Sequence, residues 1–279
     1  MKLICKKNSN LICYLNEMEG LGYNKIQALI RKKDIRVNGN KVKEDCKIFI
    51  GDVIELFAPN NFLFKYEIIY EDDNVVIVNK PKKLEVVSET KDISLINLIN
   101  PNYYAVHRLD YNTEGLVVIA KNLESKKSLD EAIKNRKVDK QYVTICKNTP
   151  LLNEKTFKDY HIFNDGKAKI SNKKFAGYSE IITKVETLKI KNNFSLLLVD
   201  LITGKSHQIR SHLAFHNLYV LGDEKYGDFN INKKLNLKNQ ILRAVKLTFH
   251  FDTNDILYNL NNKTFSVDYT DIQDYFESL

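Results

Sequence analysis

Two short segments of the chain hold more reactive side chains than a structural scaffold needs. In the first, His107 and Arg108 stand next to Asp110, in a polar turn that leads into the apolar run 116–120. A carboxylate beside two basic side chains is a candidate for catalysis. Aspartate also begins many ordinary turns, because its side chain bonds its own backbone. The spacing alone leaves both interpretations of Asp110 open.

The second segment covers residues 200–212. A Thr-Gly pair ends an apolar strand, and the polar run that follows is too regular for an ordinary loop. Within it, Arg210 is either a surface charge or the fixed partner of a buried carboxylate.

Three histidines, His207, His212 and His216, raise the question of a metal site. His212 and His216 are four residues apart and could share one face of a helix. No cysteine or acidic ligand lies at a matching spacing, and His207 belongs to the polar run. We therefore predict no bound metal.

The elements that must position these side chains fall into two groups, and residues 1–60 form the first. Apolar residues at helical spacing predict two short helices, and Asn38-Gly39 predicts a tight turn between strands. This segment holds 11 Lys and Arg residues against 7 Asp and Glu residues, so it carries +4 of the net charge of +8.

A basic cluster, defined as Arg31, Lys32, Lys33 and Arg36, lies where the second of these helices should end. Such a cluster is often only a solvated helix end, whose positive charge offsets the helix dipole. It could instead contact phosphates. A net charge of +8 on 279 residues is compatible with a polyanionic partner but does not prove one.

Beyond a linker at residues 59–61 the pattern changes from helices to strands. Apolar runs predict strands near residues 68–78, 116–120, 141–145, 195–201 and 242–251. Few helices separate them and no βαβ rhythm appears, so the fold class is α+β, with a mainly antiparallel sheet in a domain spanning residues 66–279. The chain contains neither common glycine-rich phosphate loop, which argues against nucleotide enzymes of those kinds.

Composition and targeting signals point to the cytoplasm. The chain is 43% hydrophobic and 28% charged, which excludes wholesale disorder. Its four cysteines are scattered, so we expect reduced thiols rather than disulfides. No signal peptide or membrane-spanning run is recognisable, so we expect a cytoplasmic protein without a membrane partner. We also expect it to be a monomer.

The motifs of the second domain resemble those of a known family. The string HRLDYNTEGLVVIAKN at 107–122 resembles the catalytic motif of the RluA-type RNA pseudouridine synthases. The string TGKSHQIRSHLAFHNLYVLGDEKYG at 203–227 resembles that family's second signature. Looser matches are YEDDNVVIVNKP at 70–81, KQY at 140–142 and LRAVKLTFH at 242–250.

This resemblance implies an isomerase, or intramolecular transferase, that converts uridine in RNA to pseudouridine and needs no cofactor. It makes Asp110 the nucleophile, Tyr142 the residue that stacks on the base, and Arg210 the bidentate partner of the aspartate. The resemblance also implies five substrate-binding residues. Ile209 would pack on the other side of the uracil, Arg108 would fill the space left by the flipped base, and His107 would orient the loop. The other two are His207 and Gln208.

Residues 1–60 resemble the αL-type RNA-binding module named after ribosomal protein S-four, through IRVNGNKV and GDVIEL. The basic cluster would then hold RNA by its phosphates. We expect large-subunit (23S) ribosomal RNA as the substrate, with transfer RNA as the alternative. No motif encodes which uridines are modified, or how many.

The chain departs from the family pattern at three places. The usual KPAG is Lys80-Pro81-Lys82-Lys83, so its glycine is missing; Glu114 stands where serine is common; and Lys205-Ser206 replaces Arg-Thr. None of these changes removes the aspartate, the tyrosine or the arginine.

Two other functions remain open. A non-catalytic RNA-binding or ribosome-associated protein could keep this fold, although the intact Asp110, Tyr142 and Arg210 argue against decay of the site. An aspartate-nucleophile hydrolase would need a second carboxylate, for which Glu114 is the nearby candidate.

Overall fold

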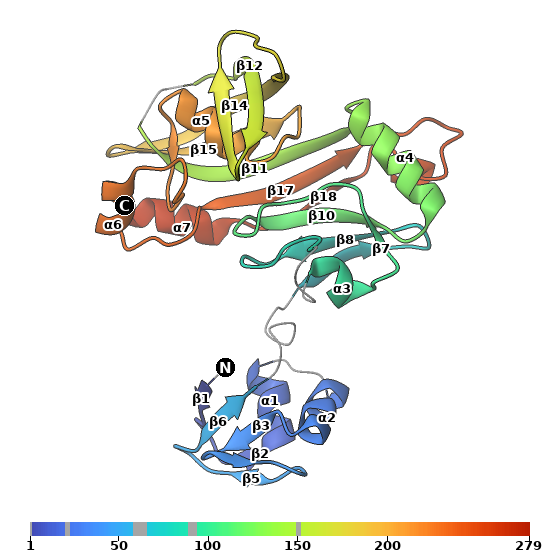
Figure 1. Cartoon of the computed structure of the whole chain (residues 1–279), viewed down its shortest axis with the longest axis vertical. Helices are drawn as coiled ribbons and strands as arrows, with labels where there is room; N and C mark the ends of the chain where they lie inside the picture. The colour runs from blue at the N-terminus through green and yellow to red at the C-terminus, as the bar shows by residue number, and fades with distance from the viewer. Residues whose placement is uncertain (1, 20–22, 58–65, 89–93, 149–151) are drawn as a thin grey trace. The chain divides into compact units, whose positions relative to one another are not determined.

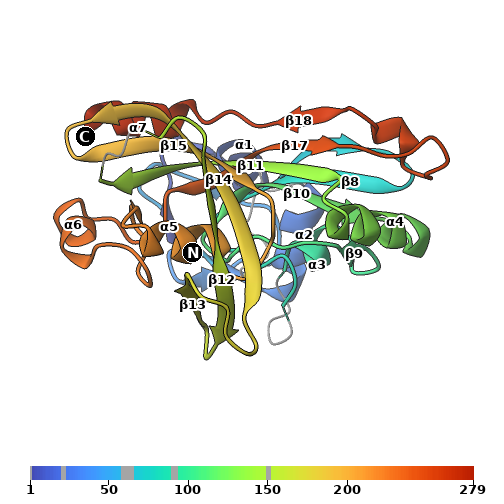
Figure 2. The ribbon, with the colours of Figure 1, turned by 90° about the horizontal axis from the view of Figure 1, so that it is seen from above.

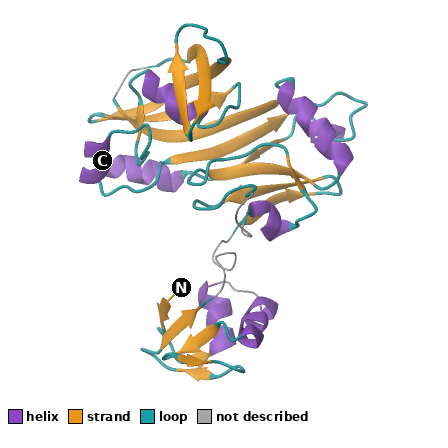
Figure 3. Ribbon diagram, in the orientation of Figure 1, coloured by secondary structure: helices purple, strands orange, loops and turns teal. Residues whose placement is uncertain are grey.

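The computed structural model describes residues 2–19, 23–57, 66–88, 94–148 and 152–279. Within these ranges the chain forms two compact units, Met1–Lys65 and Tyr66–Leu279. Strands predominate in the second unit (Figure 3).

The first unit packs two helices, α1 (Leu11–Glu19) and α2 (Tyr23–Lys32), with small sheets. Its main sheet has the strand order β1-β6-β3-β4, which are Lys2–Ile4, Val53–Leu56, Ile35–Val37 and Asn40–Lys41. A second pair consists of β2 (Ser9–Asn10) and β5 (Lys47–Ile48). Asn38 and Gly39 join β3 to β4 with φ angles of 51° and 79°, so the predicted tight turn is confirmed.

The second unit is built on one large mixed sheet (Figures 1 and 2). Its central path is β13-β12-β14-β15-β11-β17-β10-β8-β7, which in that order are Lys167–Ser171, Lys155–Asn164, Ser179–Lys191, Phe194–Leu201, Val138–Lys147, Leu242–Phe249, Glu114–Ala120, Val75–Lys80 and Glu67–Glu71. Short strands β9 (Tyr104–Ala105), β16 (Tyr219–Val220) and β18 (Thr264–Ser266) pair with β10, β11 and β17. The β10–β17 pairing is parallel and the other described pairings are antiparallel, so the predicted mainly antiparallel α+β fold is confirmed.

Helices cover this sheet and its ends. They are α3 (Leu95–Ile99), α4 (Leu123–Lys134), α5 (Gln208–Phe215), α6 (Phe229–Lys234), α7 (Thr270–Ser278) and the 3₁₀ turn η2 (Tyr258–Leu260). Asn122 caps α4 through a reciprocal bond pair with Ser125. Figure 2 shows α4 and α5 on the same side of the central strands β11, β17 and β10. This is the face on which the site residues gather.

Apolar clusters hold the second unit together. One joins buried residues of β8, β10 and β17 to Leu129 and Ala132 of α4. The other joins β11 and β15 to Ile272 and Phe276 of α7. Burying a side chain of this size contributes about 1.5–3 kcal/mol, so these clusters make the central strands a rigid base for the loops at their ends.

Candidate active site

Asp110 lies in the tight turn that leads into β10. The backbone N–H of Thr113 donates to the carbonyl of Asp110 over 2.9 Å, which closes the turn. Gly115 then adopts a φ of +113°, and a Cβ at this position would lie 2.2 Å from the carbonyl oxygen of Ala244 on β17. Only glycine permits this approach of β10 to β17, and it fixes where the Asp110 turn leaves the sheet.

Arg210, on α5, joins Asp110 to a second carboxylate. Its Nη1 donates to Oδ2 of Asp110 over 2.8 Å. Its Nε and Nη2 donate to Oδ2 and Oδ1 of Asp223 over 2.6 and 2.9 Å. The Asp223 side chain is fully buried, whereas 21% of the Asp110 side chain is exposed. The arginine is therefore anchored on Asp223 and presents its remaining nitrogen to Asp110, so the bidentate pair expected with Asp110 is instead formed with Asp223.

This arrangement keeps a permanent positive charge beside Asp110. Burial disfavours the charged guanidinium, but the two carboxylates, Asp223 foremost, outweigh burial and raise the pKa of Arg210 above its usual value. Asp223 is itself held by the backbone N–H groups of Lys225 and Tyr226. A fork of this kind needs the planar donors of arginine, which lysine lacks.

Tyr142 lies on β11 next to a register shift against β17 between Gln141 and Tyr142. Its side chain is buried, and burial, followed by the negative charge of Asp110, raises the pKa of its phenol well above the usual value. At neutral pH this tyrosine is therefore an uncharged ring with a hydroxyl group.

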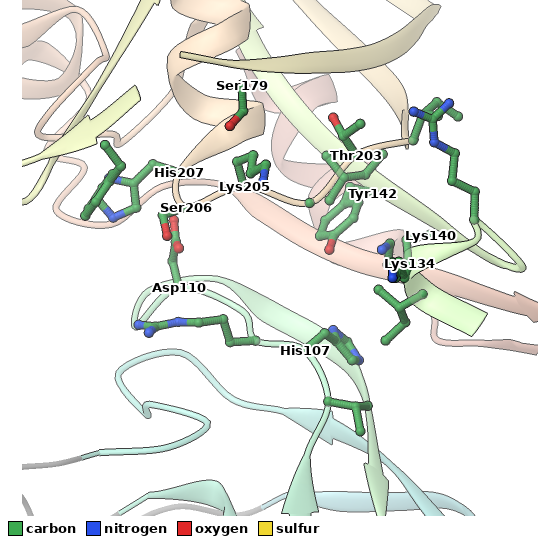
Figure 4. Close-up of a pocket in the computed structure, with 18 of the residues that line it drawn as sticks. His107, Asp110, Lys134, Lys140, Tyr142, Ser179, Thr203, Lys205, Ser206 and His207 are labelled. Carbon is green, nitrogen blue, oxygen red and sulfur yellow. The ribbon is translucent and has the colours of Figure 1, made fainter. Parts of the chain in front are cut away.

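Asp110 and Tyr142 border a cavity of about 860 Å³ that opens between α4, β11 and the loop before α5 (Figure 4). Five cationic side chains line it against two carboxylates, Asp110 and Glu180; the cations are Arg108, Lys134, Arg136, Lys140 and Lys205. The positive charge of this cavity favours binding of a polyanion, and part of that polyanion could then lie beside the Asp110 carboxylate in the cavity wall.

Most of the predicted site residues of this unit come together beside a smaller cavity of about 50 Å³. It is bordered by Asp110, Tyr142, Arg210, Arg108, Ile209, His207 and Gln208. His107 lines the larger cavity instead. Its Nε2 accepts the backbone N–H of Val118 over 3.0 Å, and this bond attaches the turn to β10.

Gln208 and His207 brace the loop before α5. The Gln208 amide bonds Thr203, Lys205 and Thr183, so its polar atoms are occupied within the protein. His207 has a left-handed φ of 57°, and its Nδ1 lies 2.9 Å from the hydroxyl oxygen of Tyr226. Ile209 is buried, whereas Arg108 is exposed.

The basic cluster belongs to the first unit and is described there alone. Arg31 and Lys32 occupy the last turn of α2, and Lys33 follows with a φ of 60°. These three side chains are exposed, and the Arg36 guanidinium lies 4.6 Å from the ring centre of Phe57.

Four further residues belong to this site, although sequence reasoning gave them no role. They are Asp223, Tyr226, Lys140 and Lys80. Tyr226 lies under the Arg210 guanidinium, 5.3 Å from ring centre to carbon, and Lys80 is fully buried with its Nζ on the carbonyls of Pro81 and Leu84. Burial lowers the pKa of Lys80 to about 7, although Asp110 and Glu114 oppose the shift. All four lie inside the family motifs of the sequence, and this position was the one sign in the sequence that they belong to the site.

Glu114 does not complete a pair of carboxylates with Asp110. Its Oε1 lies 3.2 Å from Nζ of Lys82 and 3.1 Å from Nη2 of Arg243, and it borders a different cavity with Asp271. The second carboxylate that a hydrolase would need is therefore engaged elsewhere.

The histidines also differ from what the spacing indicated. We predicted no metal because no acidic ligand lies near His212 and His216 in the sequence. In the fold, Asp159 of β12 reaches both rings, with Oδ2 3.0 Å from Nε2 of His212 and 2.7 Å from Nε2 of His216. His207 is not part of this group.

Within the described ranges, no helix combines the length and the apolar character needed to cross a membrane.

Residues 74–215 match the protein family described as RNA pseudouridylate synthase. The chain is 31% identical over 241 residues to ribosomal large subunit pseudouridine synthase C of Rickettsia prowazekii, with 74% of this chain and 78% of that protein covered. It is 34% identical over 270 residues to an uncharacterized RNA pseudouridine synthase of Mycoplasma capricolum, with 85% and 86% covered.

Two solved human structures share the fold. RNA Pseudouridylate Synthase Domain Containing 1 superposes with a TM-score of 0.58 at 20% identity, covering 77% of this chain and 96% of that one. Domain Containing 4 gives a TM-score of 0.57 at 22% identity, covering 72% and 87%.

Proposed function

The chain belongs to the RNA pseudouridylate synthase family, as an RluA-type enzyme, and from this premise we propose that Asp110 is the carboxylate on which its reaction depends. The observation that carries the proposal is the ion-pair chain Asp110–Arg210–Asp223 at the wall of a cationic cavity. It supplies an acidic group, partly exposed, beside a charge that cannot be neutralised at any physiological pH.

The isomerisation breaks the bond between ribose and ring nitrogen 1 and forms a new bond from ribose to ring carbon 5. Carbon 5 loses a proton and nitrogen 1 gains one, so the atoms of the nucleotide balance and no cofactor is consumed. A carboxylate can attack the ribose, attack the ring, or stabilise a glycal-like intermediate. Each route needs the ionised form, and Nη1 of Arg210 donates to Oδ2 of Asp110 over 2.8 Å.

The uridine has to leave the RNA helix to reach Asp110, at a cost of a few kcal/mol. We propose that Tyr142 and Ile209 hold the uracil between them and that Arg108, which is exposed at the cavity rim, enters the vacated space. His107, His207 and Gln208 hold the surrounding loops in place by the bonds described above. Because the Tyr142 phenol stays neutral, its role is to stack on the base and offer a hydroxyl group.

We propose large-subunit ribosomal RNA as the substrate. The Rickettsia relative is named for that substrate, and the first unit presents the basic cluster as a candidate phosphate-binding face of the S-four type. Transfer RNA is the alternative. We further propose a cytoplasmic monomer, which sedimentation equilibrium would contradict if it gave a multiple of the chain mass.

The substrate proposal is tested with purified enzyme and two unmodified transcripts, one of 23S ribosomal RNA and one pool of transfer RNAs. Pseudouridine is mapped at nucleotide resolution after a single turnover with enzyme in excess. We expect site-specific conversion in the ribosomal transcript. Conversion confined to transfer RNA would overturn ribosomal RNA as the substrate. Release of free uracil would overturn the isomerase mechanism.

A further inference from the structure

We infer that Asp159, His212 and His216 form a binding site for one divalent transition-metal ion, with Zn²⁺ as the best fit. The site is separate from the Asp110 cavity, and its residues do not border that cavity. The inference does not depend on the proposed reaction, because it concerns different side chains and a different ligand.

The three candidate ligand atoms converge from two elements. Asp159 lies on β12, His212 lies in the last turn of α5 and His216 caps the same helix. The two Nε2 atoms and the carboxylate oxygen all lie within 4.8 Å of one another. A tetrahedral zinc ion with bonds of about 2.0–2.1 Å keeps its ligand atoms about 3.3 Å apart. To admit the ion, the two Asp159 contacts of 3.0 and 2.7 Å would lengthen by a few tenths of an ångström, and the two Nε2 atoms, which lie within 4.8 Å of each other, would move to that spacing.

The chemistry of the three side chains fits zinc better than a hard cation. Two imidazole nitrogens and one carboxylate oxygen suit zinc, whereas magnesium and calcium prefer oxygen ligands alone. Three protein ligands leave the fourth position for water. His216 keeps 28% of its side chain exposed, so an ion can enter from solvent, whereas His212 and Asp159 are buried.

Neighbouring residues hold both rings in the orientation that a metal needs. Nδ1 of His212 lies 2.8 Å from Oγ1 of Thr183, so an Nδ1–H can donate to this oxygen and leave Nε2 free to bind. The His216 ring stacks on Phe157 with ring centres 3.9 Å apart and planes 12° apart. Fixed rings reduce the entropy lost when a metal binds.

A metal-free role for the same three residues is the competing reading. Without an ion, Asp159 accepts a hydrogen bond from each Nε2–H, and Thr183 donates to Nδ1 of His212. Both interpretations use the same contacts, but only a metal site requires the Nε2 atoms of His212 and His216 to carry no proton. The two readings therefore differ in whether the ion binds, which can be measured directly.

In the bound state the ion would clamp the C-terminal end of α5 to β12. Because α5 also carries Arg210 and Ile209, the clamp would stabilise the helix that supports the Asp110 site without touching substrate. A ligand that binds only the folded chain raises its thermal stability.

The test uses full-length protein without an affinity tag, stripped with a chelator and titrated with Zn²⁺ against a chromophoric competitor. We expect one equivalent per chain and a rise in Tm, with a tetrahedral absorption spectrum when Co²⁺ replaces Zn²⁺. Asp159→Asn and His216→Gln should each weaken Zn²⁺ binding at least tenfold. His216→Gln changes a partly exposed residue, and circular dichroism checks the fold of both variants.

His250→Gln is the matched control, because His250 also bonds an aspartate, Asp139, over 2.8 Å but has no third ligand nearby among the described residues. This variant should bind Zn²⁺ like the unmodified chain. Failure of the unmodified chain to bind one equivalent, or equal affinity in both site variants and the control, would overturn the metal site.

Discussion

At the residue scale, Arg210 divides its donors unequally between two carboxylates. Two nitrogens bind the buried Asp223 and one binds Asp110. The buried pair fixes the guanidinium plane, and the single remaining bond positions Oδ2 of Asp110. Removing one member of a buried ion pair typically costs about 3–5 kcal/mol, so Asp223 supports the fold as well as the position of Asp110.

Arg210→Lys tests this geometry, because lysine keeps the charge but cannot bridge both carboxylates. A misplacement of about 1 Å can cost about 10²-fold in rate, and we expect a loss of that size in single-turnover pseudouridine formation. Circular dichroism should show an unchanged fold at 25 °C.

Arg243→Lys provides the control, since Arg243 also bridges two carboxylates, Glu114 and Asp271, but borders neither cavity near Asp110. Its rate should stay near that of the unmodified enzyme. Near-normal kinetics for Arg210→Lys would count against the role of the ion pair.

At the element scale, the loop after β8 shows how the missing family glycine is accommodated. Lys83, at the position of that glycine, keeps a left-handed φ of 63°. The loop is still attached to the Asp110 turn, because the backbone N–H of Leu84 donates to the carbonyl of Tyr111 over 3.3 Å. Lys83 thus adopts a backbone conformation that favours glycine.

Lys83→Gly should therefore stabilise the protein. A non-glycine residue in this conformation destabilises the fold by about 1–2 kcal/mol, and glycine would remove this strain. Glycine also gives the unfolded chain more freedom, which lowers the stability by about 0.5–1 kcal/mol. The net gain is about 0.5–1 kcal/mol, or about 1–4 °C in Tm by calorimetry. Lys83→Ala keeps the backbone strain and should show no gain; equal Tm values for the two variants would refute the strain.

The bond from the backbone N–H of Val118 on β10 to the His107 ring, two residues after β9, predicts acid sensitivity. Burial, helped by the charge of Lys140, lowers the pKa of His107 to about 3. Between pH 6.5 and about 3 the unfolded chain therefore binds the proton that the folded chain does not, so the free energy of unfolding falls as the pH falls.

His107→Gln removes this titration and can still accept the Val118 N–H. We expect a shallower loss of stability in urea titrations between pH 6.5 and 4, by at most about 1.4 kcal/mol per pH unit. The other histidines remain in both proteins, so the difference isolates His107. Parallel pH profiles would show that His107 is not held neutral.

Local sequence patterns predict the hairpin at Asn38-Gly39 and the buried strands, since each depends on neighbouring residues. The site is harder to predict, because Asp110 and Arg210 are 100 residues apart and only family resemblance connected them. Asp223 lay within a recognised motif, yet spacing could not show that it anchors Arg210. Asp159 gave no local signal at all, since the packing of α5 against the strands next to β12 brings it to His212 across 53 residues.

At the scale of the whole molecule, the net charge of +8 divides between two tasks. The first 60 residues carry +4, including the basic cluster, whereas the second unit places five of its Lys and Arg side chains around the cavity. Phosphate contacts dominate RNA affinity and weaken with salt, whereas the proposed reaction on bound RNA depends on Asp110 and Arg210.

We therefore expect RNA affinity to fall steeply with salt while the single-turnover rate at saturation changes little. Replacing the four residues of the basic cluster by glutamine should reduce the slope of log affinity against log salt by about 3–4. Filter binding and single-turnover kinetics measure the two quantities. A rate at saturation that falls in parallel with affinity would contradict this division.

The most direct test of the central claim maps pseudouridine at nucleotide resolution in RNA from cells that lack the gene. The lost positions are then examined after complementation with the unmodified gene or with Asp110→Asn, with RNA binding of the purified variant as control. We predict that defined positions in large-subunit ribosomal RNA disappear and return with the unmodified gene only, while Asp110→Asn binds RNA within a few-fold of normal. Restoration of those positions by Asp110→Asn, or a map that does not depend on the gene, would contradict the assignment.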